Sequence, residues 1–459
     1  MAMNASSWTR ALGARLLAEA NDIKRTPEAL AAELGIPLPH VRAALAGLLK
    51  SEDYRALFEA VARRYPIALE RLWIEPADTT GGTRHVTAAE SAASRRVFER
   101  ARRDGTLAPY YEYRDTAMSR NAPFRPEWIR PLRVIDDVDP RNRDVAYNKG
   151  HFLHQTTLFV GPVNFYWEVD GVARCAAMDT GDSNYITPFW PHSFASRDPA
   201  CPGYIVAVTY GGEVSRARDE LARLDTDAVA TIPVELRDAR AASAAVLRRH
   251  LAHETLGEAR FADLCAAHGV PGSRVAALLA GQDVPGFAEL AVMADVLGVT
   301  PRDLLPPART PNDEVVIARR SESAAYRFPE DGAPAYEVVR LARSRQQPYL
   351  KSFILRVLPA APPAELRVAL HQYVFNHGAE PVRLVVSAEG EERALVLAPQ
   401  DSAYLAPLAR CRFECVGTAT AEVFLVRVPG ALHADAVFEL SAIAPAGLAR
   451  AAAETTRWF

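Results

Sequence analysis

The chain carries two copies of the same pair of segments, and this internal repeat constrains its fold more than any other feature. In the first pair, ALAAELGIPLPHVRAALAG (29–47) matches DLCAAHGVPGSRVAALLAG (263–281). In the second pair, LHQTTLFVG (153–161) matches LHQYVFNHG (370–378). The two segments occur in the same order in both copies, so we expect a tandem duplication of a two-part unit.

The first repeated part predicts helices. Apolar residues recur at spacings of three and four, and a Gly-x-Pro tripeptide interrupts them at Gly35 and at Gly269. This pattern is typical of two short helices joined by a tight turn. It resembles the helix-turn-helix of phage-repressor-type regulators.

The second repeated part predicts strands. Apolar runs such as VNFYWEV (163–169) and AEVFLVRV (421–428) alternate with turns, and DSNYITPFWPHSF (182–194) matches DSAYLAPLARCRF (401–413). Two short motifs separated by such strands, the first opening with Gly-His, resemble the cupin β-barrel. We therefore expect an α+β protein with four parts. They are a helical domain like a helix-turn-helix (1–84), a catalytic cupin barrel (85–225), a second helical domain (226–309) and a degenerate, metal-free cupin barrel (310–459).

Charge and cysteine content exclude several classes of protein. The chain has 53 basic and 56 acidic residues, so it lacks the basic excess that binds nucleic acid or an anionic membrane by bulk electrostatics. A small anionic ligand needs only a local cluster of cations and remains open. The five cysteines are scattered, and no apolar run approaches the length of a membrane span. We expect a cytoplasmic protein.

Comparison of the two copies separates candidate chemistry from candidate structure. His151 falls opposite Val368, and His192 falls opposite Cys411. The first barrel therefore has two histidines that the second lacks. Two imidazoles with an oxygen ligand are a common way to hold a mononuclear non-haem iron. The alternative is that both are buried, hydrogen-bonded histidines.

The third ligand is less certain from the residues alone. Gln155 recurs as Gln372 in the barrel where no metal is expected, and a neutral amide is a weak iron ligand. A water or a distant carboxylate is an equally good expectation on these grounds. Four residues of flat strand span roughly 13 Å, so His151 and Gln155 reach one ion only if the chain bends between them.

The motifs GHFLHQ (150–155) and PFWPHSF (188–194), on this helical and cupin architecture, resemble the phosphonate-processing non-haem iron oxygenases. This family includes 2-hydroxyethylphosphonate dioxygenase and hydroxypropylphosphonate epoxidase, and the resemblance covers nearly the whole chain. Its members place a glutamate ligand four residues after the first histidine or six before the last. Those positions are Gln155 and Ile186, so both glutamates are absent. The resemblance then implies Fe(II) bound by His151, Gln155 and His192.

The resemblance also implies a reaction. It is the cleavage of 2-hydroxyethylphosphonate by O₂, without 2-oxoglutarate, to methylphosphonate and CO₂ or bicarbonate. The sister reaction, which gives hydroxymethylphosphonate and formate, is one alternative. A transcriptional regulator of helix-turn-helix and cupin architecture and a metal-free ligand-binding cupin are alternatives from other classes. We expect a phosphonate and O₂ as partners, no nucleic acid and no membrane; a homo-oligomer stays open.

Further residues are implied to bind the substrate. A buried phosphonate needs charge-assisted donors, because an unpaired buried anion is very costly. Lys24 is unique to the first copy, since Glu258 stands at its place in the second. The alternative for each charged candidate is a solvated surface residue. The expected substrate-binding residues are Lys24, Arg103, Tyr113 (with Tyr111 as the alternative), Asn148 and Ile186.

Overall fold

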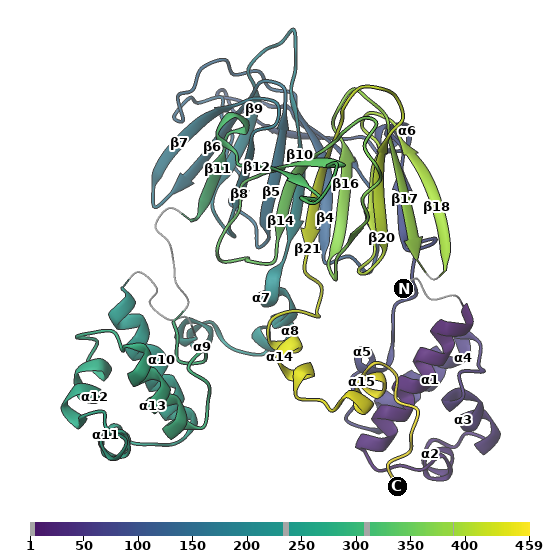
Figure 1. Cartoon of the computed structure of the whole chain (residues 1–459), viewed down its shortest axis with the longest axis vertical. Coiled ribbons are helices and arrows are strands. Elements are labelled where there is room, and N and C mark those ends of the chain that lie inside the picture. The colour runs from purple at the N-terminus through teal and green to yellow at the C-terminus, as the bar shows by residue number, and fades with distance from the viewer. Residues whose placement is uncertain (1–4, 233–237, 307–312, 389) are drawn as a thin grey trace. The chain divides into compact units, whose positions relative to one another are not determined.

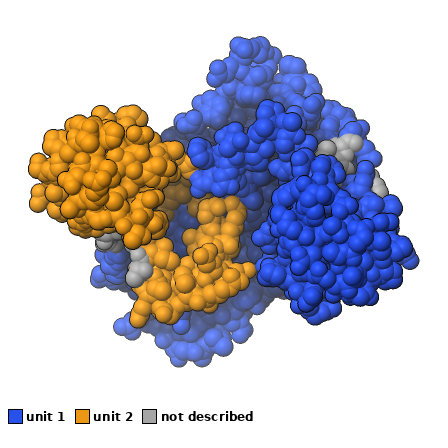
Figure 2. Space-filling model, turned by 90° about the horizontal axis from the view of Figure 1, so that it is seen from below, with its two compact units in different colours: residues 1–210, 317–343, 349–459 blue, residues 211–316, 344–348 orange. Residues whose placement is uncertain are grey.

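A computed structural model describes residues 5–232, 238–306, 313–388 and 390–459. The chain forms two compact units, coloured separately in Figure 2. One unit comprises residues 1–210, 317–343 and 349–459, and the other comprises residues 211–316 and 344–348. Figure 1 labels the helices and strands along the chain.

The N-terminal segment of the larger unit is helical. The repeated Gly-x-Pro lies between its second and third helices. Gly35 ends the first of these in the left-handed region, at φ +66°, where a glycine is unstrained. Leu12, Leu30, Val41 and Phe58 lie in the buried core of the segment. Its helices are α1 (Ala5–Asp22), α2 (Pro27–Leu34), α3 (Leu38–Leu45), α4 (Ser51–Arg64) and α5 (Leu69–Leu72).

The smaller unit is also helical. Its repeated Gly-x-Pro lies between α11 and α12, and Gly269 again has a positive φ, +91°. Phe261, Val275 and Met293 are buried in its core. Its helices are α7 (Gly212–Arg216), α8 (Arg218–Leu221), α9 (Thr226–Thr231), α10 (Ala239–His253), α11 (Glu258–Ala267), α12 (Gly272–Leu279) and α13 (Phe287–Leu297).

The strands form two pairs of antiparallel sheets, consistent with a cupin-like β fold. The first pair is a seven-stranded sheet, β11-β8-β5-β10-β4-β3-β2, and a three-stranded sheet, β7-β6-β9. The second pair is a seven-stranded sheet, β1-β19-β16-β21-β14-β13-β12, and a four-stranded sheet, β15-β20-β17-β18. We call these pairs the first barrel and the second barrel. Residues of both sheets of the second barrel share one buried core, among them Val374, Leu425, Leu384 and Phe413.

The bounds of the strands follow the predicted apolar runs. The first ten strands are β1 (Thr83–Val86), β2 (Arg96–Ala101), β3 (Leu107–Asp115), β4 (Phe124–Pro131), β5 (His154–Val160), β6 (Val163–Val169), β7 (Val172–Met178), β8 (Ser183–Ile186), β9 (His192–Ser196) and β10 (Tyr204–Tyr210). The next five are β11 (Val315–Ala318), β12 (Ala325–Phe328), β13 (Tyr336–Arg340), β14 (Lys351–Val357) and β15 (Leu366–Arg367). The last six are β16 (His371–Asn376), β17 (Val382–Ala388), β18 (Glu391–Leu397), β19 (Ser402–Leu405), β20 (Arg410–Cys415) and β21 (Ala421–Val428).

The repeated Asp-Ser dipeptides bind segments that come from the other copy. Asp401 accepts hydrogen bonds from the backbone N–H of Ala88 at 2.7 Å and, at 3.1 Å, pairs with His85 Nε2. Asp182 accepts from Arg319 Nη1 at 2.8 Å and from the N–H of Arg320 at 2.9 Å. The two aspartates therefore hold the copies together reciprocally.

The serines of these dipeptides make the same exchange. Ser183 Oγ accepts the N–H of Ala342, and Ser402 Oγ accepts the N–H of Ala117, both at 2.9 Å. Strand β1, from the first copy, also pairs with β19 of the second barrel. Residues that recur in both copies are structural here, as comparison of the copies suggested.

The C-terminal segment returns to the N-terminal helices after α14 (Asp435–Ser441) and α15 (Pro445–Ala452). Asn21 Nδ2 donates to the carbonyl of Thr456 at 2.9 Å, and Asn21 Oδ1 accepts the N–H of Trp458 at 3.3 Å. Trp458 Nε1 donates to Glu454 at 2.8 Å, which fixes the indole. The tail is therefore a packed part of the N-terminal helical segment.

Candidate functional site

A cavity of about 270 Å³ in the first barrel contains most of the predicted site residues. Gln155 is at the start of β5, His192 is at the start of β9, and Tyr113 is on β3. His151 and Asn148 come from the loop before β5. The other lining residues are Arg100, Tyr111, Arg125, Glu127, Ile129, Leu153, Phe194 and Thr209.

A sharp bend in the chain brings His151 to Gln155. Gly150 has φ +73°, and a Cβ there would lie 2.3 Å from the carbonyl of Phe189, so the bend requires glycine. The N–H of Phe189 donates to the carbonyl of His151 at 2.8 Å and holds the loop. His151 Nε2 then lies 3.3 Å from Gln155 Oε1. This is the bend that a shared ion requires.

Backbone carbonyls fix the orientation of both imidazoles. His151 Nδ1 lies 2.9 Å from the carbonyl of Leu153, and His192 Nδ1 lies 2.9 Å from the carbonyl of Trp190. A carbonyl only accepts, so each Nδ1 carries the proton and each neutral ring presents a lone pair on Nε2. Burial lowers the pKa of His192 to about 4, which keeps this ring neutral at neutral pH.

The amide of Gln155 completes a set of acceptors. Its Nε2 donates to Thr157 Oγ1 at 2.9 Å, which turns Oε1 toward His151. With its Nδ1 donating to Leu153, His151 can present a lone pair on Nε2 to an ion that Gln155 Oε1 also faces, and these two atoms lie 3.3 Å apart. Neighbouring ligands about 2.1 Å from one ion lie roughly 3 Å apart. The donor set therefore fits a divalent transition metal.

The described part of the chain has no group of three or more His, Cys, Asp and Glu side chains suited to a metal ion. The third donor beside the two imidazoles is the neutral amide of Gln155. Its neighbour across the β5–β8 register is Ile186, which is fully buried. Ile186 does not line the cavity. Ile186 is the apolar neighbour of Gln155 on the adjacent strand β8, and its side chain cannot ligate a metal.

Asn148 places an amide donor beside His192. Its Oδ1 accepts the N–H groups of Gly150 and His192, both at 2.9 Å. These bonds fix the amide so that Nδ2 lies 3.0 Å from His192 Nε2. The bond is consistent with a lone pair on that nitrogen, and Nδ2 faces the end of the cavity where the two imidazoles meet.

The structure favours Tyr113 over Tyr111 as the substrate tyrosine. Tyr111 Oη accepts the N–H of Phe194 at 2.8 Å, and in the second copy Tyr336 accepts the N–H of Phe413 at 3.0 Å. Tyr111 therefore has a structural role that recurs. Tyr113 lines the cavity two residues further on, and burial raises its pKa to about 12, so its hydroxyl stays protonated.

The expectation for Arg103 is corrected. Arg103 is exposed in the turn between β2 and β3 and does not line the cavity. Arg100 on β2 lines it instead. The guanidinium of Arg100 lies 5.1 Å from the ring centre of Tyr110 and 5.0 Å from that of Tyr111, and it donates to the carbonyl of Ala146. A rigidly held cation thus faces the histidines.

The structure does not bring Lys24 into this cavity either. Its Nζ donates to the carbonyl of Asn21 at 3.0 Å, at the end of α1, and lies 5.0 Å from the ring centre of Trp458. Arg125 and Glu127, both on β4, line the cavity and were missed. The registers make Lys351 the counterpart of Arg125, and because both are basic, a comparison of the two copies would not single Arg125 out.

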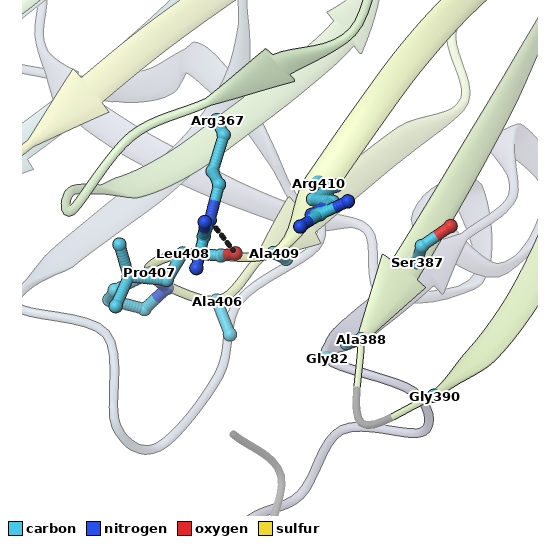
Figure 3. Close-up of a pocket in the computed structure, with 10 residues that line it drawn as sticks. All are labelled: Gly82, Arg367, Ser387, Ala388, Gly390, Ala406, Pro407, Leu408, Ala409 and Arg410. Carbon is cyan, nitrogen blue, oxygen red and sulfur yellow. Dashed lines mark hydrogen bonds between the residues drawn. The ribbon is translucent and has the colours of Figure 1, made fainter.

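Another cavity, of about 410 Å³, lies in the second barrel (Figure 3). Arg367 and Arg410 carry its charged groups, and the Arg367 Nε donates to the carbonyl of Leu408 at 3.4 Å. None of the residues drawn is a histidine, cysteine, aspartate or glutamate. Among the described residues that line this cavity, none offers a metal ligand of those types. No helix in the described ranges is both long and apolar enough to cross a membrane.

Paired antiparallel sheets bring two imidazoles and an amide together, an arrangement consistent with a cupin-like fold and suited to a metal ion. Known proteins were compared with this chain. No protein-family model matches it. It is 34% identical to the methylphosphonate synthase of Nitrosopumilus maritimus (strain SCM1) over 451 residues, which is 97% of this chain and 95% of that protein. The chain belongs to the methylphosphonate synthase family of phosphonate oxygenases.

Solved structures agree with this assignment. The 2-hydroxyethylphosphonate dioxygenase of Streptomyces albus, solved with 2-hydroxyethylphosphonate and Fe(II) bound, is 36% identical. It matches with a TM-score of 0.89 over 99% of this chain and 100% of that one. A second 2-hydroxyethylphosphonate dioxygenase structure, 22% identical, has a TM-score of 0.75 over 95% of this chain and 99% of its own. That second match shows the fold alone.

Proposed function

We propose that this protein is an Fe(II)-dependent oxygenase that cleaves 2-hydroxyethylphosphonate with O₂ to methylphosphonate and CO₂ or bicarbonate. The observation that carries the proposal is the convergence of three lone pairs, on His151 Nε2, His192 Nε2 and Gln155 Oε1, in one buried cavity. The relation to a methylphosphonate synthase over 97% of the chain supports it.

These three residues would hold the iron. Bound Fe(II) supplies the one-electron chemistry with O₂ that organic side chains cannot perform. The carbonyls of Leu153 and Trp190 keep each ring in the tautomer that presents Nε2. Thr157 keeps the oxygen of the amide, and not its nitrogen, toward His151. These bonds come from residues close in sequence and fix the rings and the amide. Asn148 Nδ2, 3.0 Å from His192 Nε2, would move aside for the iron.

The phosphonate would bind beside the histidines. Arg100 supplies a fixed positive charge, held against two tyrosine rings. Tyr113 donates a hydrogen bond, because its raised pKa keeps the proton on oxygen. Asn148 Nδ2 offers an amide N–H beside His192 that can orient the substrate. Charge-assisted bonds of this kind offset the cost of burying an anion.

Lys24 remains a proposed substrate residue of a different kind. Within one chain its amine binds the end of α1 and lies over Trp458. A second copy of the chain would have to bring it to the cavity, so we propose that a homo-oligomer is required for this role. A size measurement of the purified protein tests whether a homo-oligomer forms. The activity of Lys24→Ala tests whether the reaction depends on Lys24.

The neutral third ligand bears on the product. An amide leaves the site one charge more positive than a glutamate would. We propose that this difference favours methylphosphonate over the sister products, hydroxymethylphosphonate and formate. Replacing Gln155 with Glu should shift the product ratio toward hydroxymethylphosphonate, measured by phosphorus NMR. An unaltered ratio with intact iron binding would count against the role of the amide.

The experiment that tests the proposed function is product identification after a single defined reaction. The protein is loaded with Fe(II) without oxygen and is then given 2-hydroxyethylphosphonate and O₂. Methylphosphonate in phosphorus NMR is the expected product. Hydroxymethylphosphonate would assign the sister reaction, and recovery of unreacted substrate would refute both.

The organisation and location predicted from the sequence complete the proposal. We propose a tandem of helical and cupin domains with boundaries near residues 84, 225 and 309, and a cytoplasmic enzyme that does not bind nucleic acid. Strand β1 (Thr83–Val86) spans the first of these boundaries and pairs with the second barrel. Limited proteolysis would locate the boundaries, because cleavage concentrates at exposed segments between domains.

A further inference from the structure

The second barrel keeps a cavity at the place that corresponds to the site in the first barrel. Gln155 lies opposite Thr209 in the β5–β10 register, and Gln372 lies opposite Arg427 in the β16–β21 register. Thr209 lines the first cavity, and Arg427 lines the second. The second cavity measures about 520 Å³, against about 270 Å³ for the first. Duplication has preserved the space while its lining has changed.

The second barrel lacks the metal-binding histidines proposed for the first barrel and has a cation at the corresponding end of its cavity. Val368 and Cys411 stand where the first barrel has His151 and His192. Arg427 Nε donates to Gln372 Oε1 at 3.1 Å. The amide oxygen that faces His151 in the first barrel thus holds a guanidinium in the second, and burial raises the pKa of the Cys411 thiol to about 12, so it is neutral. The cavity has its own permanent positive charge.

More cations gather around the same ring. The guanidinium groups of Arg427 and Arg343 lie 5.6 Å and 4.9 Å from the ring centre of Phe353, which lines the cavity. Lys351 is opposite Arg427 in the β14–β21 register. Arg340 is opposite Phe353 in the β13–β14 register. Arg427 lines the cavity, and Arg343, Lys351 and Arg340 lie beside the ring of Phe353 or at neighbouring positions of the same sheet.

Neither Arg427 nor Arg343 has an acidic partner among the residues that the structure describes. Nε and Nη2 of Arg343 are buried without a hydrogen-bond partner in the described part of the chain. Glu365, which also lines the cavity, faces Arg410 at 3.7 Å. Burial lowers the pKa of Arg343 and of Lys351, and neighbouring cations lower each further. Buried cations of this kind need an anion to offset their desolvation.

Apart from Glu365 and Arg367, most of the remaining walls are apolar. Tyr336, Val338, Leu355 and Leu425 line the cavity beside Phe353. A simple inorganic ion would leave these surfaces exposed to water, whereas an organic anion with an apolar body would cover them. The cavity thus combines a cationic end with a hydrophobic wall, the arrangement that binds a small amphiphilic anion.

We propose that the cavity of the second barrel is a binding site for a small organic anion with a carboxylate or phosphonate head and an apolar body. The head binds Arg427, with the charge of Arg343 beside the same phenyl ring, and the body packs against Phe353, Leu355 and Leu425. The site uses neither iron nor O₂, so it stands or falls separately from the proposed oxygenase activity. It gives the second barrel a role as a ligand-binding domain.

Calorimetric titration of the full-length, iron-free protein tests this site, with phenylacetate and phenylphosphonate as probes and benzyl alcohol as the neutral control. The expected result is that one or both anions bind and that the alcohol does not. The tighter anion identifies the head group. Arg427→Gln should weaken this binding about tenfold or more, since charge-assisted hydrogen bonds are lost.

Two further variants keep the result clear. Val368→Trp should fill the cavity and abolish binding while leaving all its charges in place. Arg100→Gln, in the first barrel, should leave binding in the second unchanged. The proposal is overturned if neither anion binds at millimolar concentration, if folded Arg427→Gln binds as tightly as the natural protein, or if Arg100→Gln alone removes the binding.

Discussion

Replacing Arg100 with Gln should reduce the efficiency of the reaction far more than replacing Arg103 with Gln. Arg100 lines the cavity and is held against Tyr110 and Tyr111, whereas Arg103 is exposed in the turn after β2. Hydrogen bonds to a charged group contribute about 1.5–3 kcal/mol each. One such bond to the phosphonate corresponds to roughly 10- to 150-fold in kcat/KM. Arg103→Gln should change kcat/KM by less than about twofold.

The assay is steady-state consumption of 2-hydroxyethylphosphonate by the iron-loaded enzyme. Arg100 also donates to the carbonyl of Ala146, so its removal can disturb the neighbouring loop. Thermal unfolding and iron content of both variants control for this, and Arg100→Lys should recover part of the charge effect. A large loss in Arg103→Gln together with normal activity in Arg100→Gln would refute the assignment and restore Arg103.

Three other perturbations test the surrounding structure. Gly150→Ala should lose iron binding, because its Cβ would meet the carbonyl of Phe189; iron content at normal stoichiometry would contradict the bend. Asp401→Asn should lower the free energy of unfolding by about 1–3 kcal/mol through its bonds to His85 and Ala88, and denaturant unfolding measures this. Burial lowers the pKa of His371 from 6.5 to about 4. As the pH falls, the unfolded state therefore protonates this histidine at a higher pH than the folded state does. The free energy of unfolding should therefore fall by up to about 3 kcal/mol between pH 6.5 and 4, and His371→Phe should weaken that dependence.

The sequence predicted the elements of the fold because both copies carry their own turn and strand patterns. The two helices around Gly35 and the strands after His151 and His371 follow the repeated motifs. The exchange of edge strands between barrels was not predicted, because it depends on contacts such as Asp182 with Arg319 that join distant segments. Periodicity describes a strand and does not identify its neighbour.

The candidate site was predicted best where the two copies differ. His151 and His192, which the second copy lacks, line one cavity, and so does Asn148, which the family resemblance implied. Arg103 was matched to a phosphonate-binding arginine of the family, but it lies in the turn after β2, and Arg100 on that strand lines the cavity instead. The residue type alone did not decide whether Gln155 is the third ligand, because the orientation of its amide depends on Thr157 and on the fold of the preceding loop.

The two barrels show two outcomes of one duplicated space. In the first, acceptors converge and fit a metal; in the second, Arg427 occupies the corresponding end and is held by the equivalent amide. A guanidinium has no acceptor and cannot ligate a metal, so Arg427 also excludes an ion from the second barrel. The contrast shows how two copies of one fold can differ, the first carrying the proposed oxygenase site and the second the proposed anion site.

Anomalous X-ray scattering at the iron absorption edge, on crystals loaded with Fe(II) without oxygen, tests the central claim most directly. The account predicts a single strong peak bounded by Nε2 of His151, Nε2 of His192 and Oε1 of Gln155. A peak beside Arg427, or the absence of any peak in a protein that still turns over 2-hydroxyethylphosphonate, would contradict it.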